Sequence, residues 1–232
     1  WLTYKFAVPG AAGAGLDFTV QNKSGYKVEI SPDGRQWYER FNSWNDTPTV
    51  RSIDLSFMTG SMDELVALKT IIPPADKEFI VADSGSELQR EQCRYVNSGG
   101  TVTYKLSFPN LKECQLEFMV GNAYAIFGSK DGVLWHEILT ANKSGIDSEP
   151  FQKDITWIRM VEVTDYLNPT GTVYVKFTST DDKSRNNNQP AYLQRITVYG
   201  IYQTNTIFAR FSPTLAGNNN ELEIKQITFR QW

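Results

Sequence analysis

A tryptophan and an amide stand side by side in a polar stretch of the chain. Trp44 and Asn45 lie within residues 41–48, whose polar composition does not fit a core strand. An indole offers a flat apolar face, and a side-chain amide offers both donors and acceptors. These groups suit a site that stacks on the C–H face of a sugar ring and hydrogen-bonds its hydroxyls. An ordinary packed tryptophan is the alternative for Trp44.

Similar side-chain types recur further along the chain. Trp157 and Arg159 alternate along a strand-like run and so face the same side, either as a binding pair or as a core tryptophan beside an arginine stem. Arg185 and Asn187 offer donors in a polar run, which a solvated connection explains equally well. The predicted ligand-binding residues are, in full, Trp44, Asn45, Trp157, Arg159, His136, Arg185 and Asn187.

Catalytic chemistry has little support. The chain contains one His and two Cys, which excludes a structural zinc site of His/Cys type and any scheme with two catalytic histidines. His136 follows Trp135 and so lies on the opposite face of a regular strand, as a surface or groove histidine. No nucleophile elbow, phosphate loop, EF-hand loop or dinucleotide fingerprint occurs. We predict no catalytic residue, although paired carboxylates for glycoside hydrolysis depend on spatial separation and stay open.

Composition narrows the class of protein. The chain has 232 residues, of which 41% are hydrophobic, and a net charge of -3, so it can bury a sizeable core and lacks the basic character of nucleic-acid binding. No apolar stretch approaches the ~18 residues of a spanning helix. Cys93 and Cys114 are either a disulfide of an oxidising compartment or two buried thiols. The chain opens inside a strand-like alternation, so we expect a processed protein or a fragment of a longer one.

The segments that must position these residues occur twice. Residues 4–6 (Tyr-Lys-Phe) recur as 104–106 (Tyr-Lys-Leu), and residues 16–20 recur as 116–120, both at an offset of 100. The element Ser-x-Asp-Gly-x-x-Trp stands at residues 31–37 and again at 129–135, at an offset of 98. A shorter connecting loop in the second copy explains the change of offset. The sequence therefore predicts a tandem domain duplication.

Each copy is expected to be a series of short strands. Alternating apolar residues in 16–20 and 116–120 are typical of half-buried strands. The Asp-Gly pairs predict tight turns, beyond which Trp37 and Trp135 are expected to plug the core. Residues 65–69 are the expected first-copy equivalent of the strand 172–177. Many short strands with closely spaced turns predict an all-β fold of tandem antiparallel β-sandwich (jelly-roll) domains.

Three segments follow from the repeat. Residues 1–72 form an incomplete first copy, and residues 73–202 form the second, after a linker around the two prolines at 73 and 74. Residues 203–232 are either part of a third copy or strands that complete the first sandwich.

The repeated Ser-x-Asp-Gly-x-x-Trp element follows an aromatic strand, and the runs 165–167, 171–177 and 196–200 fit the same pattern. Together they resemble the galactose-binding-domain-like jelly rolls, which include discoidin-type domains and many carbohydrate-binding modules. The resemblance covers most of residues 78–200 and the middle of the first copy. It implies an accessory module of a secreted or cell-surface, often bacterial, carbohydrate-active protein that binds glycans through loops at one end of the sandwich. It assigns no ligand residue position by position.

The resemblance also implies a possible structural calcium ion, because many members of that family hold one. Asp181 and Asp182 could ligate calcium through hard oxygens, and an exposed acidic loop explains them equally well.

Three functions follow as expectations. The first is a non-catalytic module pair that binds a glycan or polysaccharide, with neighbouring domains of the same protein as further partners. The second is a structural or protein-interaction module of adhesion type. The third is a jelly-roll glycosidase or polysaccharide lyase, which requires clustered carboxylates, or a group of Tyr, His136 and Arg, in a cleft.

Overall fold

The computed structural model describes residues 1–21, 25–43, 49–60, 62, 64–89, 92–141, 156–180, 190–214 and 222–232, with the backbone alone for residues 156 and 157. The described residues form antiparallel sheets with very little helix. This confirms the prediction of an all-β fold consistent with a β-sandwich.

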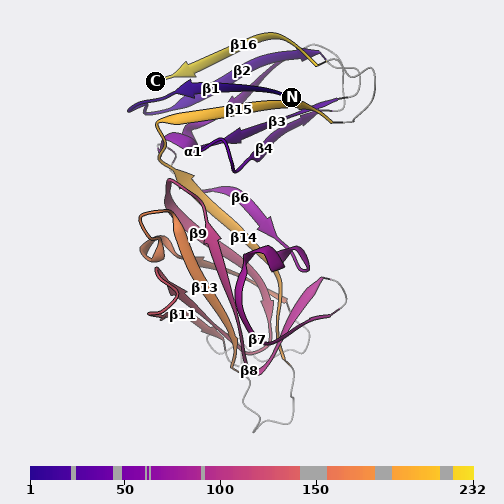
Figure 1. The fold of residues 1–232 in the computed structure, drawn as a ribbon, viewed down its shortest axis with the longest axis vertical. Helices are drawn as coiled ribbons and strands as arrows, with labels where there is room; N and C mark the ends of the chain where they lie inside the picture. Colours follow the sequence, from indigo (N-terminus) through magenta and orange to yellow (C-terminus); the bar gives the residue numbers. More distant parts are fainter. Residues whose placement is uncertain are drawn as a thin grey trace. The chain divides into compact units, whose positions relative to one another are not determined.

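The chain divides into two compact units. Unit 1 is assembled from Trp1–Val66, Pro109–Lys112 and Gly200–Trp232, and unit 2 from Ala67–Phe108 and Glu113–Tyr199. Figure 1 shows this discontinuity by colour, since indigo strands from the start of the chain lie among yellow strands from its end in unit 1. The domain boundaries at residues 72 and 202 stay a prediction.

Unit 1 contains a four-stranded and a three-stranded sheet. The first has the order β1-β15-β3-β4 and the second the order β16-β2-β5. A short helix, α1, follows β5. The bounds are β1 (Leu2–Ala7), β2 (Ala14–Gln21), β3 (Tyr26–Ser31), β4 (Tyr38–Ser43), β5 (Val50–Asp54), α1 (Ser56–Thr59), β15 (Thr206–Pro213) and β16 (Glu223–Gln231).

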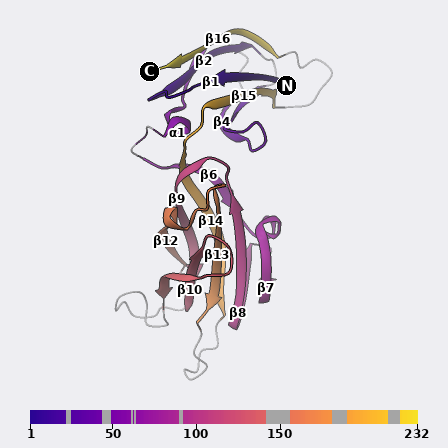
Figure 2. The same ribbon diagram turned by 60° about the vertical axis from the view of Figure 1, so that its left-hand side comes forward.

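Unit 2 is built on a nine-stranded sheet. Seven strands follow the order β11-β10-β13-β8-β14-β9-β12, while β6 pairs with β14 and β7 with β8. Figure 2 shows β7 beside β8. The bounds are β6 (Val66–Ile71), η1 (Ala75–Phe79), β7 (Ile80–Gln89), β8 (Cys93–Ser107), β9 (Leu111–Gly121), β10 (Tyr124–Ser129), β11 (His136–Ala141), β12 (Thr156–Glu162), η2 (Thr164–Tyr166), β13 (Thr172–Ser179) and β14 (Ala191–Tyr202), where η marks a 3-10 helix.

Alternating apolar residues make the core of unit 1. On β2, Leu16, Phe18 and Val20 are buried, as the period of two in the sequence predicts. The Phe18 ring meets Phe211 of β15 at a centroid distance of 5.3 Å and Tyr26 of β3 at 6.3 Å, both edge to face. Because these partners belong to the other sheet, the two sheets of unit 1 pack face to face.

Strand order recurs between the units. The order β1-β15-β3-β4 in unit 1 corresponds to β8-β13-β10-β11 in unit 2, and β16-β2-β5 corresponds to β14-β9-β12. Lys5 pairs with Phe208, and Lys105 pairs with Tyr174. Each lysine Nζ lies over the ring of its partner, 5.7 and 5.8 Å from the centroid. The offset of 100 therefore relates residues that occupy corresponding strand positions.

The equivalent of β13 in unit 1 is β15 rather than the segment around residues 65–69. Strand β15 lies between β1 and β3, as β13 lies between β8 and β10, whereas β6 (Val66–Ile71) pairs with β14. The expectation for residues 65–69 is wrong because the true equivalent lies about 140 residues further along the chain, a pairing that local pattern does not reveal.

Both Ser-x-Asp-Gly elements close the same turn. Ser31 and Ser129 accept a hydrogen bond from the glycine N–H, and Oδ1 of Asp33 and Asp131 accepts the next two backbone N–H groups. These distances are 2.8, 2.8 and 2.9 Å in unit 1, and 2.9, 2.8 and 2.9 Å in unit 2. The turn role predicted for the two aspartates matches this geometry.

The two tryptophans after these turns do not plug the core. Trp37 and Trp135 are half-buried, and each ring is covered by a cation. The Arg210 guanidinium carbon lies 4.1 Å from the Trp37 ring centroid, and the Lys176 Nζ lies 4.4 Å from that of Trp135. Since the covering cations come from corresponding strands, β15 and β13, both rings pack against the side chains of a neighbouring strand.

Candidate functional site

The structure describes only part of the predicted ligand site. Trp44, Asn45, Arg185 and Asn187 lie outside the described residues, as do Asp181 and Asp182, and of Trp157 only the backbone in β12 is described. Arg159 and His136 are described with their side chains.

Arg159 belongs to a side-chain arrangement that recurs in both units. It pairs with Phe118, just as Arg51 pairs with Phe18. Burial raises the pKa of the Tyr124 hydroxyl to about 12, and the charge of Arg159 acts in the opposite direction. Burial likewise raises the pKa of Tyr26, opposed by Arg51. An arginine therefore lies near a buried tyrosine in both units, and the ligand-binding role of Arg159 stays a prediction.

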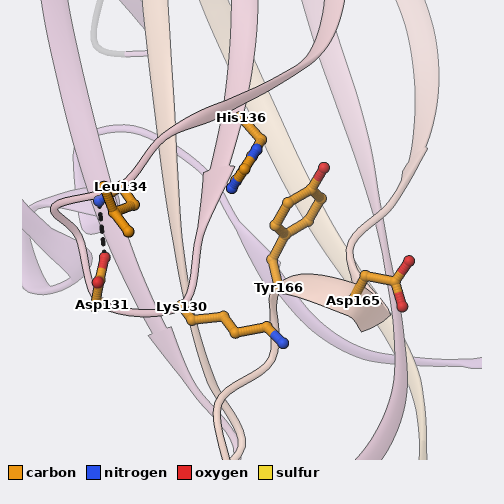
Figure 3. A pocket seen from close by; sticks show the side chains of 6 residues that line it. All are labelled: Lys130, Asp131, Leu134, His136, Asp165 and Tyr166. Atoms are coloured by element: carbon orange, nitrogen blue, oxygen red, sulfur yellow. Dashed lines mark hydrogen bonds between the residues drawn. The ribbon is translucent and has the colours of Figure 1, made fainter.

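His136 lines a hollow of about 310 Å³ in unit 2. Its imidazole and the ring of Tyr166 lie with their centroids 5.9 Å apart and their planes at 31°. Figure 3 shows the two rings beside each other, with Lys130 reaching toward the base of the tyrosine. The lining residues come from the turn after β10, the start of β11, and η2: Lys130, Asp131, Leu134, His136, Asp165 and Tyr166.

Gly128 on β10 makes room for the Tyr166 ring. A Cβ at this buried glycine would lie 2.7 Å from Cδ2 of Tyr166 and 2.8 Å from Cδ1 of Ile138, so any larger residue would displace a neighbouring side chain. Several hydrogen bonds hold the short helix η2 that carries Tyr166. The Tyr166 N–H donates to the Val163 carbonyl at 2.9 Å, and the Cys114 N–H donates to Thr164 Oγ1 at 2.9 Å. Packing and backbone bonds therefore fix this side of the hollow.

The two carboxylates of the hollow differ in their partners. Backbone N–H groups of Leu134 and Val133, together with the Ser129 hydroxyl, lower the pKa of Asp131, whose Oδ1 accepts all three hydrogen bonds. Asp165 and Lys130 are exposed and bring one acceptor and one donor to the rim. The hollow therefore combines two rings with separate polar groups of both signs, which can hold a cyclic polar ligand.

Sequence reasoning found one residue of this hollow and missed its partners. His136 was expected as a surface or groove histidine, and its exposed side chain lines the hollow, while its role in ligand binding stays a prediction. Residues 165–167 were interpreted only as part of a fold pattern. Nothing in the sequence links Tyr166 to the turn at Asp131, which lies 35 residues earlier. The glycine at position 128, within an aromatic strand, was the available signal, since a strand glycine often marks a close approach.

The described residues also bear on metal ligation and on membrane crossing. Among the residues that the structure describes, no group of three or more His, Cys, Asp or Glu side chains could hold a metal ion. Calcium binding by Asp181 and Asp182 stays a prediction. Cys93 and Cys114 are free thiols. None of the helices in the described ranges is long and apolar enough to cross a membrane.

The chain was compared with known proteins at the level of sequence and of structure. The sequence matches no family model and no curated protein. Among solved structures, a GH115 4-O-methyl-α-glucuronidase, BtGH115A, gives a TM-score of 0.40 at 11% identity over 61% of this chain and 18% of that protein. The extracellular domain of ANXUR1 from Arabidopsis thaliana gives 0.41 at 8% identity over 86% and 81%.

A third similar structure is the carbohydrate-binding module CBM6cm-2 from Cellvibrio mixtus lichenase 5A, solved with cellotriose. It gives a TM-score of 0.34 at 14% identity, over 57% of this chain and 97% of the module. The chain thus spans less than a fifth of the glucuronidase and most of the other two proteins. None of these matches assigns the chain to a family.

Proposed function

We propose that the chain is a non-catalytic pair of β-sandwich modules that binds glycan, from a secreted or cell-surface protein, and that unit 2 holds a sugar residue in the hollow of His136 and Tyr166. The observation that carries this proposal is the pairing of two partly open rings, 5.9 Å apart, with a lysine and a carboxylate at the same rim. Aromatic rings suit the C–H face of a pyranose, and the polar groups suit its hydroxyls.

The hollow favours binding over catalysis. Hydrolysis by paired carboxylates needs one group free to donate a proton, whereas Asp131 is engaged by the backbone N–H groups of its own turn. A polysaccharide lyase, the other catalytic alternative, needs a base beside a group that neutralises the charge of a uronate. His136, Tyr166 and Lys130 are side chains of these types, so an activity assay tests this alternative. We expect no release of reducing sugar and no unsaturated uronate from polysaccharide incubated with the chain.

Affinity gel electrophoresis of the full chain tests the proposal. The gels contain a mixed-linkage β-glucan, a xylan or an arabinogalactan, and migration is compared with a gel that contains no polysaccharide. We expect at least one polysaccharide to retard the wild-type chain. His136→Ala and Tyr166→Ala, each of which removes a ring, should weaken that retardation about tenfold, the factor equivalent to 1.4 kcal/mol.

Glu137→Ala is the matched control. Glu137 is exposed and adjacent to His136 on β11, so strand alternation directs it to the other face. Unchanged retardation in the two pocket variants would reject the hollow as the site. Equal migration on every gel would reject glycan binding altogether. The other predicted ligand residues stay predicted contributors and are to be changed to Ala in the same assay: Trp44, Asn45, Trp157, Arg159, Arg185 and Asn187.

A protein partner is the second candidate function, and one observation favours it. Val133 and Leu134 lie beside the hollow and are 74% and 70% exposed, whereas the corresponding residues in unit 1 are Arg35 and Gln36. Exposed aliphatic side chains at a fixed turn suit a contact with a neighbouring domain. Val133→Ser should leave glycan retardation unchanged if this turn serves a protein partner instead, since Val133 is not among the residues that line the hollow.

A further inference from the structure

The indole of Trp232 lies flat on the outer face of the sheet β16-β2-β5. The backbone of Trp232 pairs with Gly13, with N–H to carbonyl distances of 2.8 and 3.1 Å in the two directions. A Cβ at Gly13 would lie 2.3 Å from the indole Nε1, and a Cβ at Gly15 would lie 3.5 Å from Cζ3. The ring therefore extends across both glycines, and Trp232 is 60% exposed.

The two glycines provide space for the ring. Neither has the positive φ that would call for glycine on backbone grounds, and both are buried beneath the neighbouring side chains. In unit 2 the offset of 100 places Glu113 and Gln115 at the corresponding positions. The flat seat for an indole is thus a feature of unit 1 alone.

A polar group of fixed geometry borders the ring. Arg230 contacts Asp17 through two bonds, Nε to Oδ2 at 2.8 Å and Nη2 to Oδ1 at 2.9 Å. The Ser52 hydroxyl donates to the same Oδ1 at 2.6 Å. This hydrogen bond and those of Arg230 lower the pKa of Asp17, with burial opposing them. The Arg230 guanidinium carbon lies over the Trp232 ring at 5.9 Å from its centroid, so the remaining guanidinium donors lie beside the indole.

We propose that Trp232, Arg230 and Asp17 form a second glycan-binding site, an open platform in unit 1 on which a pyranose stacks against the indole while Arg230 and Asp17 bind its hydroxyls. The inference rests on the proposed function, in that both concern glycans, but the two sites share no residue. An open platform suits an internal sugar of a long polysaccharide, because neither end of the chain has to enter a cavity.

The extent of the apolar surface favours a sugar over a protein partner. On the same sheet face, the rows beyond Trp232 carry Arg230, then Asp17 and Ser52. Among the described residues, the nearest exposed aliphatic residue on this face is Val50, which lies three rows of paired residues away from Trp232. At two residues per row, this is about 20 Å along the strands. A stable protein interface needs roughly 800 Å² on each partner with a continuous apolar core. A single ring bordered by charged and hydroxyl groups matches the size of one sugar.

The test uses the full chain in affinity electrophoresis on the three polysaccharides named above. Trp232→Ala should weaken retardation about tenfold. Gly13→Ala should do the same although the tryptophan is retained, because the new methyl group forces the ring off its seat. Trp1→Ala is the control, since Trp1 is 84% exposed and has no such seat. Circular dichroism and the unfolding midpoint must match the wild type, and Trp232→Phe, which keeps a flat ring, should retain part of the binding.

The outcomes separate the platform from the hollow of unit 2. Loss in Trp232→Ala and Gly13→Ala, with Trp1→Ala unchanged, supports the platform. Full binding in Trp232→Ala overturns the platform, and if His136→Ala with Tyr166→Ala then binds weakly, the proposed function survives without the platform. Unchanged binding in Gly13→Ala alone would mean a non-specific apolar contact and also overturns the platform. Self-association in sedimentation that Trp232→Ala abolishes would assign the ring to a second copy of the chain instead.

Discussion

The Arg94 guanidinium forms a bidentate ion pair with the Asp76 carboxylate inside unit 2, with Nε 2.6 Å from Oδ2 and Nη2 2.8 Å from Oδ1. Asp76 is 1% exposed and Arg94 is 4% exposed. The Tyr104 hydroxyl donates to the same Oδ2 at 2.9 Å, and Arg94 Nη1 donates to Ser86 at 3.0 Å. The pair thus connects η1, which carries Asp76, to β8 and β7.

Removing one partner of this pair should be costly. Asp76→Ala removes both hydrogen bonds from the buried Arg94 guanidinium to a carboxylate and leaves it only the more exposed Asp83, 3.5 Å from Nη1, so we expect the free energy of unfolding to fall by about 3–5 kcal/mol. Urea unfolding followed by fluorescence measures this loss. The double variant Asp76→Leu with Arg94→Met should lose less than either single variant, because no buried charge remains. A double variant as unstable as the two losses combined would contradict this account.

The glycines of the two repeated turns should tolerate substitution unequally. Gly132 has φ +76° and Gly34 has φ +74°, so alanine is strained in both, by roughly 1–2 kcal/mol. A Cβ at Gly132 would lie 3.2 Å from the Tyr174 ring, against 3.5 Å from the Phe208 ring at Gly34. We expect Gly132→Ala to destabilise more than Gly34→Ala in thermal unfolding. Gly132→Asn, a residue that accepts this backbone conformation more readily, should recover part of the loss.

Acid should weaken the turn of unit 2 through Asp131. Its pKa is lowered by the N–H groups of Leu134 and Val133 and by Ser129. A lowered folded-state pKa contributes stability above the unfolded-state value, near 4, that is lost as the pH falls through the folded-state value. Asp131→Asn should therefore flatten the fall in unfolding midpoint between about pH 5 and about pH 2. Glu137→Gln, at an exposed position on the next strand, should leave the slope unchanged.

The two thiols should differ in reactivity. Burial, with a smaller contribution from the charge of Glu162, raises the pKa of Cys114 to about 12, so about one thiol in ten thousand is ionised at pH 8. Cys93 is partly exposed. Iodoacetamide at pH 8 should label Cys93 in the native chain and Cys114 only in urea, as mass spectrometry of peptides would show. Equal labelling rates in the native chain would contradict the buried position of Cys114.

Local pattern accounts for the parts of the fold that depend on near neighbours. The alternation in residues 16–20 and 116–120 predicted the inward residues of β2 and β9, and the Asp-Gly pairs predicted the turns before β4 and β11. These features depend on side-chain period and on turn geometry within a few residues. The same reasoning placed Trp37 and Trp135 in the core, because local sequence does not reveal which strand will supply the cations Arg210 and Lys176.

The candidate sites depend on contacts between distant segments. His136 was expected at a groove, but Tyr166 meets it only through the packing of η2 against β10 at Gly128. Trp232 finds its seat on Gly13 across more than 200 residues of chain. Neither contact has a signature in the spacing of residues, which is why the predicted ligand residues were chosen by side-chain type, partly from polar loops and partly from strand-like runs.

The position of β15 between β1 and β3 has a consequence for the order of folding during synthesis. The four-stranded sheet of unit 1 has a vacant centre until residues 206–213 leave the ribosome, since β1 pairs with no other described strand of that sheet. The strands assigned to unit 2 are translated earlier and can pair as they emerge. Unit 2 is therefore expected to fold first. Until β15 is synthesised, the N-terminal strands have unpaired edges that chaperones or other copies of the chain can bind.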